Sequence, residues 1–91
     1  MSAHGRFQGN SRQRRIIECA LKCADEEKFL TYDRLLEMMP ELEGISRQAV
    51  MCSVGHIERW GFLRRVREKD RTMTIRPTLR AYEVFRREPE R

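Results

Sequence analysis

A chain of 91 residues, of which 40% are apolar, can bury the core of one domain but not of two. It contains no apolar run long enough to cross a membrane and no apolar N-terminal segment of signal-peptide length. Its three cysteines, an odd number, favour free thiols over a disulfide framework. We therefore expect a soluble, cytoplasmic protein.

Charge is sorted along the chain, whose net charge is +5. Residues 1–17 carry four arginines and no acid, and residues 18–43 carry eight acids against three bases. Residues 44–91 carry twelve bases against six acids. Such sorting predicts a basic surface that can bind a polyanion, and a solvated charged surface without a partner is the alternative.

The first third of the chain predicts an arm followed by a helix. Residues 1–10 have no periodicity and are expected to form a flexible basic arm. Ser11 is expected to cap the helix and to begin the folded domain, which should extend over residues 11–88 and leave residues 89–91 as a tail. The apolar residues of this helix recur at spacings of three and four: Ile16, Ile17, Ala20, Leu21, Cys23 and Ala24.

The next part of the chain predicts two further helices, the second of which ends before Gly61. Phe29 and Leu30 form a short extended stretch, and Thr31 caps a second helix that buries Leu35, Leu36 and Met39. Pro40 ends this helix, because the residue before a proline avoids the helical conformation. After a loop over residues 40–45, Ser46 caps a third helix that ends at Trp60, before Gly61.

The remaining residues predict a hairpin and a last helix. Residues 62–76 form the two strands, with a turn from Glu68 to Arg71. On the second strand Met73 and Ile75 alternate with Thr72, Thr74 and Arg76. Thr78 caps the last helix, which carries Leu79, Tyr82 and Phe85.

The third helix has two different sides when each residue is turned by about 100°. Val50, Val54 and Ile57 share a narrow apolar sector. The opposite side carries Gln48, Cys52, Gly55 and Arg59, with Met51 and His56 at its margins. Gln can pair with adenine, Arg with guanine, and Met or Cys can contact a thymine methyl group. A polar outer side is also what any surface helix shows, so this pattern alone is a weak signal.

Basic residues around this helix strengthen a nucleic-acid interpretation. Ser46 and Arg47 stand at its N-terminus, where a phosphate can bind. The hairpin carries five cations, which we expect to neutralise phosphates: Arg64, Arg65, Arg67, Lys69 and Arg71.

The same segment resembles the winged helix-turn-helix core of MarR-type repressors. The resemblance spans about residues 29–80 and follows "S..AV...V..IE", then "GFL.R", then Asp70-Arg71 and finally Thr78. It implies an α+β fold with a three-helix core, a two-stranded β-hairpin wing and a C-terminal helix. It further implies a sequence-specific transcriptional regulator of double-stranded DNA, with the third helix in the major groove. The long terminal helices of the family are missing, so no small-molecule effector is expected, and the length fits a compact repressor of phage or plasmid type.

The sequence also bears on the partners of the protein. A homodimer through the first and last helices is expected, with Tyr82 and Phe85 as contacts, because dimers bind paired half-sites. The alternative function is a winged-helix protein–protein adaptor that binds an acidic partner.

Catalysis, metals and cofactors are not expected. Neither His4 nor His56 completes a metal site with Cys19 and Cys23, which are better interpreted as apolar core or interface residues. No base is positioned beside a nucleophile. Cys52 is either a plain contact residue or a redox-sensitive thiol.

Overall fold

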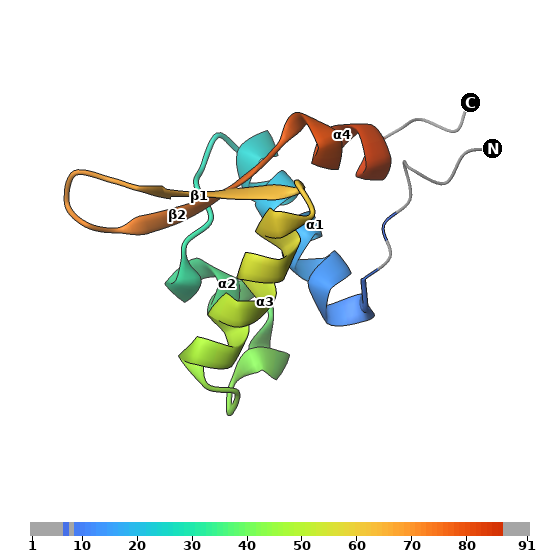
Figure 1. The fold of residues 1–91 in the computed structure, drawn as a ribbon. Helices are drawn as coiled ribbons and strands as arrows, with labels where there is room; N and C mark the ends of the chain where they lie inside the picture. The colour runs from blue at the N-terminus through green and yellow to red at the C-terminus, as the bar shows by residue number, and fades with distance from the viewer. Residues whose placement is uncertain (1–6, 8, 87–91) are drawn as a thin grey trace.

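A computed structural model describes residue 7 and residues 9–86 of the chain. Its α-helices are α1 (Ser11–Asp25), α2 (Tyr32–Met38), α3 (Arg47–Arg59) and α4 (Leu79–Phe85), and a short 3-10 helix, η1 (Pro40–Leu42), follows α2. The strands β1 (Leu63–Arg67) and β2 (Met73–Pro77) pair antiparallel (Figure 1). The described residues therefore form an α+β fold with four α-helices and one two-stranded sheet, in the predicted order.

Polar side chains cap the helices by binding backbone N–H groups. Thr31, Ser46 and Thr78 each accept a hydrogen bond from the N–H three residues ahead, as predicted. The prediction for α1 was wrong, because Asn10 caps it and Ser11 is already helical. Asn10 Oδ1 accepts from Gln13 N at 2.8 Å while Gln13 Oε1 accepts from Asn10 N at 3.0 Å. This reciprocal pair satisfies two backbone donors, whereas a serine cap supplies one bond.

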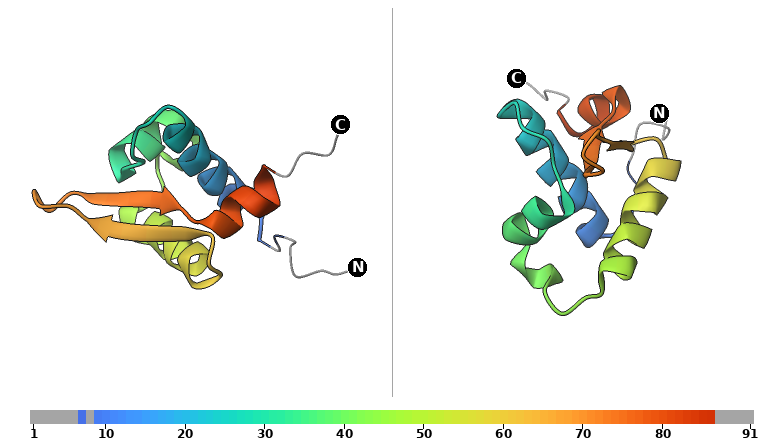
Figure 2. Two further views of the ribbon diagram at one scale, coloured as in Figure 1. Left: turned by 90° about the horizontal axis from the view of Figure 1, so that it is seen from above. Right: turned by 90° about the vertical axis from the view of Figure 1, so that its left-hand side faces the viewer.

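The core lies between α1, α3 and the sheet. α1 packs against β2, α3 packs against β1, and the two helices also contact each other (Figure 2). The larger fully buried side chains of these elements are Ile16, Ile17, Leu21, Val50, Val54, Ile57, Leu63 and Ile75. Leu30, from the predicted extended stretch, also belongs to the core. It is buried and forms an isolated β-bridge with Ile75 of β2.

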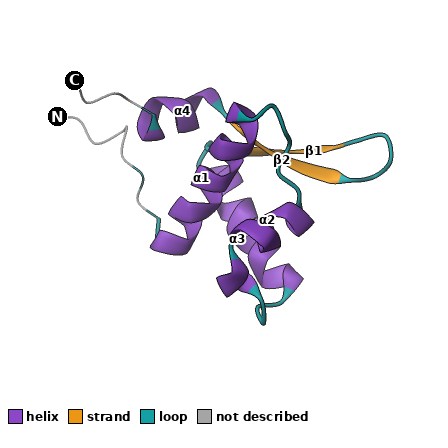
Figure 3. Ribbon diagram, turned by 180° about the vertical axis from the view of Figure 1, so that it is seen from behind, coloured by secondary structure: helices purple, strands orange, loops and turns teal. Residues whose placement is uncertain are grey.

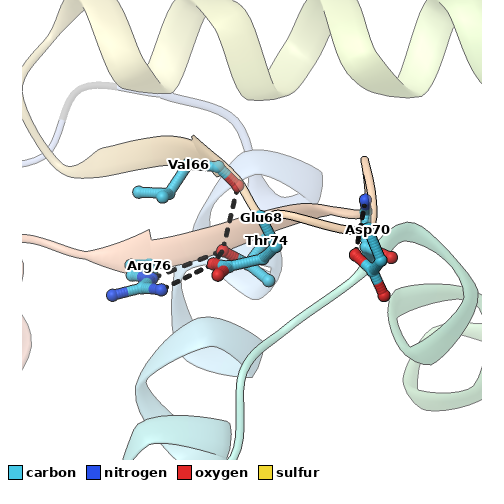
Figure 4. A network of polar contacts seen from close by, with 6 residues as sticks. Val66, Glu68, Asp70, Thr74 and Arg76 are labelled. Carbon is cyan, nitrogen blue, oxygen red and sulfur yellow. Dashed lines mark hydrogen bonds and ion pairs between the residues drawn. The ribbon is translucent and has the colours of Figure 1, made fainter.

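The hairpin projects beyond the helical body (Figure 3). Its register pairs Leu63 with Pro77 and Arg67 with Met73. Burial on β2 does not follow the alternation of apolar and polar residues, because Thr74 is buried and Met73 is only half-buried. The Thr74 hydroxyl lies 3.1 Å from the carbonyl oxygen of Val66 and 3.0 Å from Glu68 Oε2, so its burial is compensated by polar partners (Figure 4).

The folded part begins before the predicted boundary at residue 11. The ring of Phe7 makes edge-on contacts with Trp60, Phe62 and Phe85, at centroid distances of 5.8, 5.4 and 5.5 Å. Phe7 and Asn10 therefore belong to the packed structure rather than to a flexible arm. The rest of the expected arm, residues 1–6 and 8, and the expected tail, residues 89–91, lie outside the described residues.

Candidate nucleic-acid interface

α3 has the two sides that its sequence predicts. Val50, Val54 and Ile57 are 0% exposed, so this side is entirely committed to the core. The opposite side, here called the outer face of α3, consists of Gln48, Met51, Cys52, Gly55, His56 and Arg59. All of these are exposed except Met51 and Gly55, which are half-buried. Hydrogen-bonding groups are thus available on this face without any cost to the packing of the core.

Gly55 lies beside the hairpin of the same chain. A Cβ atom added to Gly55 would lie 3.7 Å from Nη2 of Arg65, an ordinary van der Waals distance. The side chain of Arg65 therefore covers the surface of α3 at Gly55.

Four of the five predicted hairpin cations are exposed and free of carboxylates. Within residues 7 and 9–86, no acidic side chain lies within ion-pair distance of Arg64, Arg67, Lys69 or Arg71. These charges are therefore available to an anionic partner.

Arg65 differs from the other hairpin cations. Its Nε donates to Glu58 Oε1 at 2.9 Å, and its backbone N donates to Glu58 Oε2 at 3.3 Å. Both side chains are about one-third exposed, at 32% and 34%. Glu58 thus joins α3 to β1 and compensates the charge of Arg65, so phosphate binding is a poorer role for Arg65 than predicted. The sequence offered one signal for this pair, a Glu in the last turn of a helix and an Arg shortly after the glycine that ends it.

A groove separates α3 and the hairpin from the start of α2. Its volume is about 250 Å³, and its lining includes Arg47, Arg67 and Arg71. Arg47 lies over the ring of Tyr32, with its guanidinium carbon 4.7 Å from the ring centroid. The three arginines were predicted from the sequence, but Tyr32 was not, because no pattern indicated that α2 would contribute to this surface.

The hairpin turn is held by two carboxylates (Figure 4). Arg76 Nη2 donates to Glu68 Oε2 at 2.7 Å, and this arginine, with Thr74, holds the pKa of Glu68 below its ordinary value. The backbone N–H of Thr72 donates to Asp70 Oδ1 at 2.9 Å and lowers the pKa of Asp70. The basic turn therefore has a defined shape while both groups are ionised.

The three cysteines have different environments. Cys19 and Cys23 are buried in α1, and burial raises the pKa of both thiols, which suits inert core residues. Cys52 is exposed on the outer face of α3. Its two predicted roles, contact residue or redox-sensitive thiol, both require this exposure.

The first helix does not offer the apolar surface expected for a dimer. Ile16, Ile17, Ala20 and Leu21 are at most 1% exposed. On α4, Phe85 packs against Phe7 and Phe62, while Tyr82 is half-buried. The most exposed large apolar residue in the described part of the chain is Leu79, at 73%. An apolar contact between copies is therefore better placed on α4 than on α1.

A second hollow lies away from α3. It has a volume of about 400 Å³ and is lined by Phe29 and Arg76 together with parts of α1 and α4. Phe29 is 53% exposed, and the guanidinium carbon of Arg76 lies 4.2 Å from its ring centroid. This hollow could not be predicted from the sequence, since its residues come from four separate segments.

Among the residues placed by the structure, no three His, Cys, Asp or Glu side chains come together to hold a metal ion. No described helix has both the length and the apolar character required to cross a membrane. Comparisons with protein-family models, with curated proteins and with solved structures gave no match. The geometry and charge of the surface are therefore the grounds for a functional proposal.

Proposed function

We propose that this chain is a winged helix-turn-helix protein that binds double-stranded DNA as a sequence-specific transcriptional regulator, a repressor by its resemblance to MarR-type proteins. α2 and α3 form the helix-turn-helix, and the hairpin of β1 and β2 is the wing. The outer face of α3 enters the major groove, and the wing contacts the phosphate backbone. In this arrangement α3 provides sequence recognition and the wing provides general affinity for DNA.

One observation carries the proposal. A helix whose inner side is fully buried presents hydrogen-bonding side chains outward, and it packs against a hairpin with four exposed cations that have no described acidic partner. The major groove, about 12 Å wide, admits one α-helix and is flanked by phosphates. Helix and hairpin together match that combination of groove and charged walls.

The geometry supports separate roles for individual side chains. Gln48 is exposed in the first turn of α3 and can pair bidentately with adenine, while Arg59 can pair with guanine or reach a phosphate. Met51 and Cys52 can contact thymine methyl groups. Arg64, Arg67, Lys69 and Arg71 serve as phosphate contacts, and Ser46 caps α3 through its hydroxyl.

Dimerisation belongs to the same proposal. A single winged helix contacts few base pairs, and two copies related by a two-fold axis recognise paired half-sites. Leu79 and Tyr82 on α4 are the residues best placed for that contact, because the apolar residues of α1 are already buried.

The proposal is tested by measuring binding to random-sequence duplex DNA. Fluorescence anisotropy gives the affinity at each of a series of salt concentrations. We expect affinity at low salt and a linear fall of log affinity with log salt concentration. Reversing Arg64 and Arg67 to Glu should flatten that line by roughly one unit per lost contact. Lys22→Glu, on α1 outside the candidate interface, is the matched control and should leave the slope nearly unchanged.

The same experiment separates DNA binding from the adaptor function. An adaptor for an acidic protein has no need of affinity for a random duplex. Absence of binding at low salt by folded protein would therefore contradict the proposal and favour the adaptor.

A further inference from the structure

Three arginines from two separate parts of the fold line one groove. Arg47 is the first residue of α3, Arg67 is the last residue of β1, and Arg71 lies in the hairpin turn. Asp33 also lines the groove, so one carboxylate faces three guanidinium groups. None of the three arginines forms an ion pair with another residue that the structure describes. The groove therefore has an excess of positive charge that the described fold does not neutralise.

Arg47 is held in place at an unfavourable position. Its guanidinium stacks over the ring of Tyr32, which begins α2. This cation–π contact restricts the motion of the guanidinium and leaves its N–H groups able to donate to oxygen atoms. A cation in the first turn of a helix is disfavoured by the helix dipole. An anion in the groove would offset that cost.

Arg71 also occupies an unfavourable position. Its φ is +72°, in the left-handed region where glycine or asparagine is usual. The three residues between Glu68 and Thr72 close the hairpin, and a residue in this conformation is typical of such turns. An arginine there costs on the order of 1 kcal/mol. The turn thus carries a charged side chain where an uncharged glycine would fit better.

We propose that this groove holds one phosphate group of the DNA backbone, contacted by Arg47 from α3 and by Arg67 and Arg71 from the hairpin. Arginine donates several N–H groups in a geometry that suits phosphate oxygens. A phosphate shared by helix and hairpin fixes the position of α3 relative to the backbone, and so sets which base pairs the outer face of α3 meets. The inference rests on the proposed function and adds a defined anchoring site to it.

Salt dependence tests whether the arginines share a phosphate, because the slope counts neutralised phosphates rather than arginines. The probe is a random-sequence duplex, and Arg64 supplies the control. Arg64 is exposed on the same strand as Arg67 but is out of phase with it, so it points to the other face of the hairpin. The triple variant Arg47→Ala/Arg67→Ala/Arg71→Ala removes every proposed contact to the shared phosphate and should lower the slope by about one unit. Adding Arg64→Ala, which removes a contact outside the groove, should lower it by about two units in total.

The outcomes separate the two proposals. Failure of the parent protein to bind any duplex would overturn the proposed function and this inference with it. Duplex binding in which Arg47→Ala/Arg67→Ala/Arg71→Ala lowers the slope by about two or three units, or leaves it unchanged, would overturn the shared phosphate alone.

The guanidinium signals of the protein distinguish a DNA phosphate from a free one. In nuclear magnetic resonance spectra, the Nε–Hε signals of Arg47, Arg67 and Arg71 should shift together when the duplex is added. Tyr32→Leu, which removes the stack but keeps an apolar side chain, should weaken the response of Arg47. Signals that respond to inorganic phosphate and not to the duplex would overturn the inference and assign the groove to a free phosphorylated ligand.

Discussion

At position 71, glycine would favour the stability of the fold, whereas arginine would favour binding of an anion. Its φ of +72° favours glycine, while its side chain lines the three-arginine groove. Arg71→Gly should therefore raise the free energy of unfolding by about 1 kcal/mol and still weaken DNA binding. Urea denaturation and fluorescence anisotropy on the same preparation measure the two effects. A variant that is less stable, or that binds as tightly as the parent, would contradict this account of Arg71.

Val54 tests the packed side of α3. It is fully buried, so Val54→Ala should leave a cavity and lower the free energy of unfolding by roughly 1–3 kcal/mol. Cys52→Ala, on the outer face of the same helix, should change it by less than about 0.5 kcal/mol. Any loss of DNA binding by Val54→Ala should vanish where the variant is fully folded. Weak binding by fully folded Val54→Ala would argue against a purely structural role.

At the scale of elements, the shape of the hairpin depends on the ionisation of Glu68 and Asp70. Both carboxyls have a lowered pKa in the fold, so their stabilising contribution is complete above their ordinary pKa, roughly 4. It is lost as the pH falls further, through the lowered values. Amide signals of Thr72 and Thr74, followed by nuclear magnetic resonance during acidification, should report loss of the turn in that range.

Glu68→Gln is the control for the pH experiment. Glutamine keeps the size of the side chain but cannot titrate, so the response of the Thr74 amide signal to acid should shrink. Hairpin signals that change only near neutral pH would contradict this role for the two carboxylates.

The helices could be predicted from local signals, while the details of the hairpin and of the start of α1 could not. Thr31, Ser46 and Thr78 cap helices because each precedes an apolar periodic segment, and a cap needs only a neighbour three residues away. Asn10 and Ser11 are both residue types that cap helices. Asn10 is the cap of α1 because Gln13, three residues ahead, completes a reciprocal pair of hydrogen bonds with it. Thr74 is buried because it bonds across the hairpin, which alternation of polar and apolar residues does not encode.

At the scale of the whole molecule, the parts of the candidate site that lie within one element could be predicted, and the parts that join different elements could not. The outer face of α3 follows from a period of 3.6 residues. The groove between Tyr32, Arg47 and Arg67 joins residues far apart in the sequence, so it depends on how α2, α3 and the hairpin pack. Glu58 and Arg65 show the same limit, because a count of hairpin cations cannot reveal that one is already paired.

Assembly is also a property of the whole molecule. We expect sedimentation at micromolar concentration to give twice the mass of one chain, with α4 in the contact. Leu79→Glu should convert this species to a monomer without lowering the stability of the single chain, because Leu79 is 73% exposed. A parent protein that remains monomeric with and without DNA would contradict recognition of paired half-sites.

The central claim is that the outer face of α3 reads base pairs, and selection from random duplexes tests it most directly. The parent protein should enrich one preferred sequence. Folded Gln48→Ala should keep that sequence except at one base pair, where preference should fall by roughly 1–3 kcal/mol. Failure of the parent to enrich any sequence, or an identical preferred sequence and affinity for Gln48→Ala, would contradict the claim.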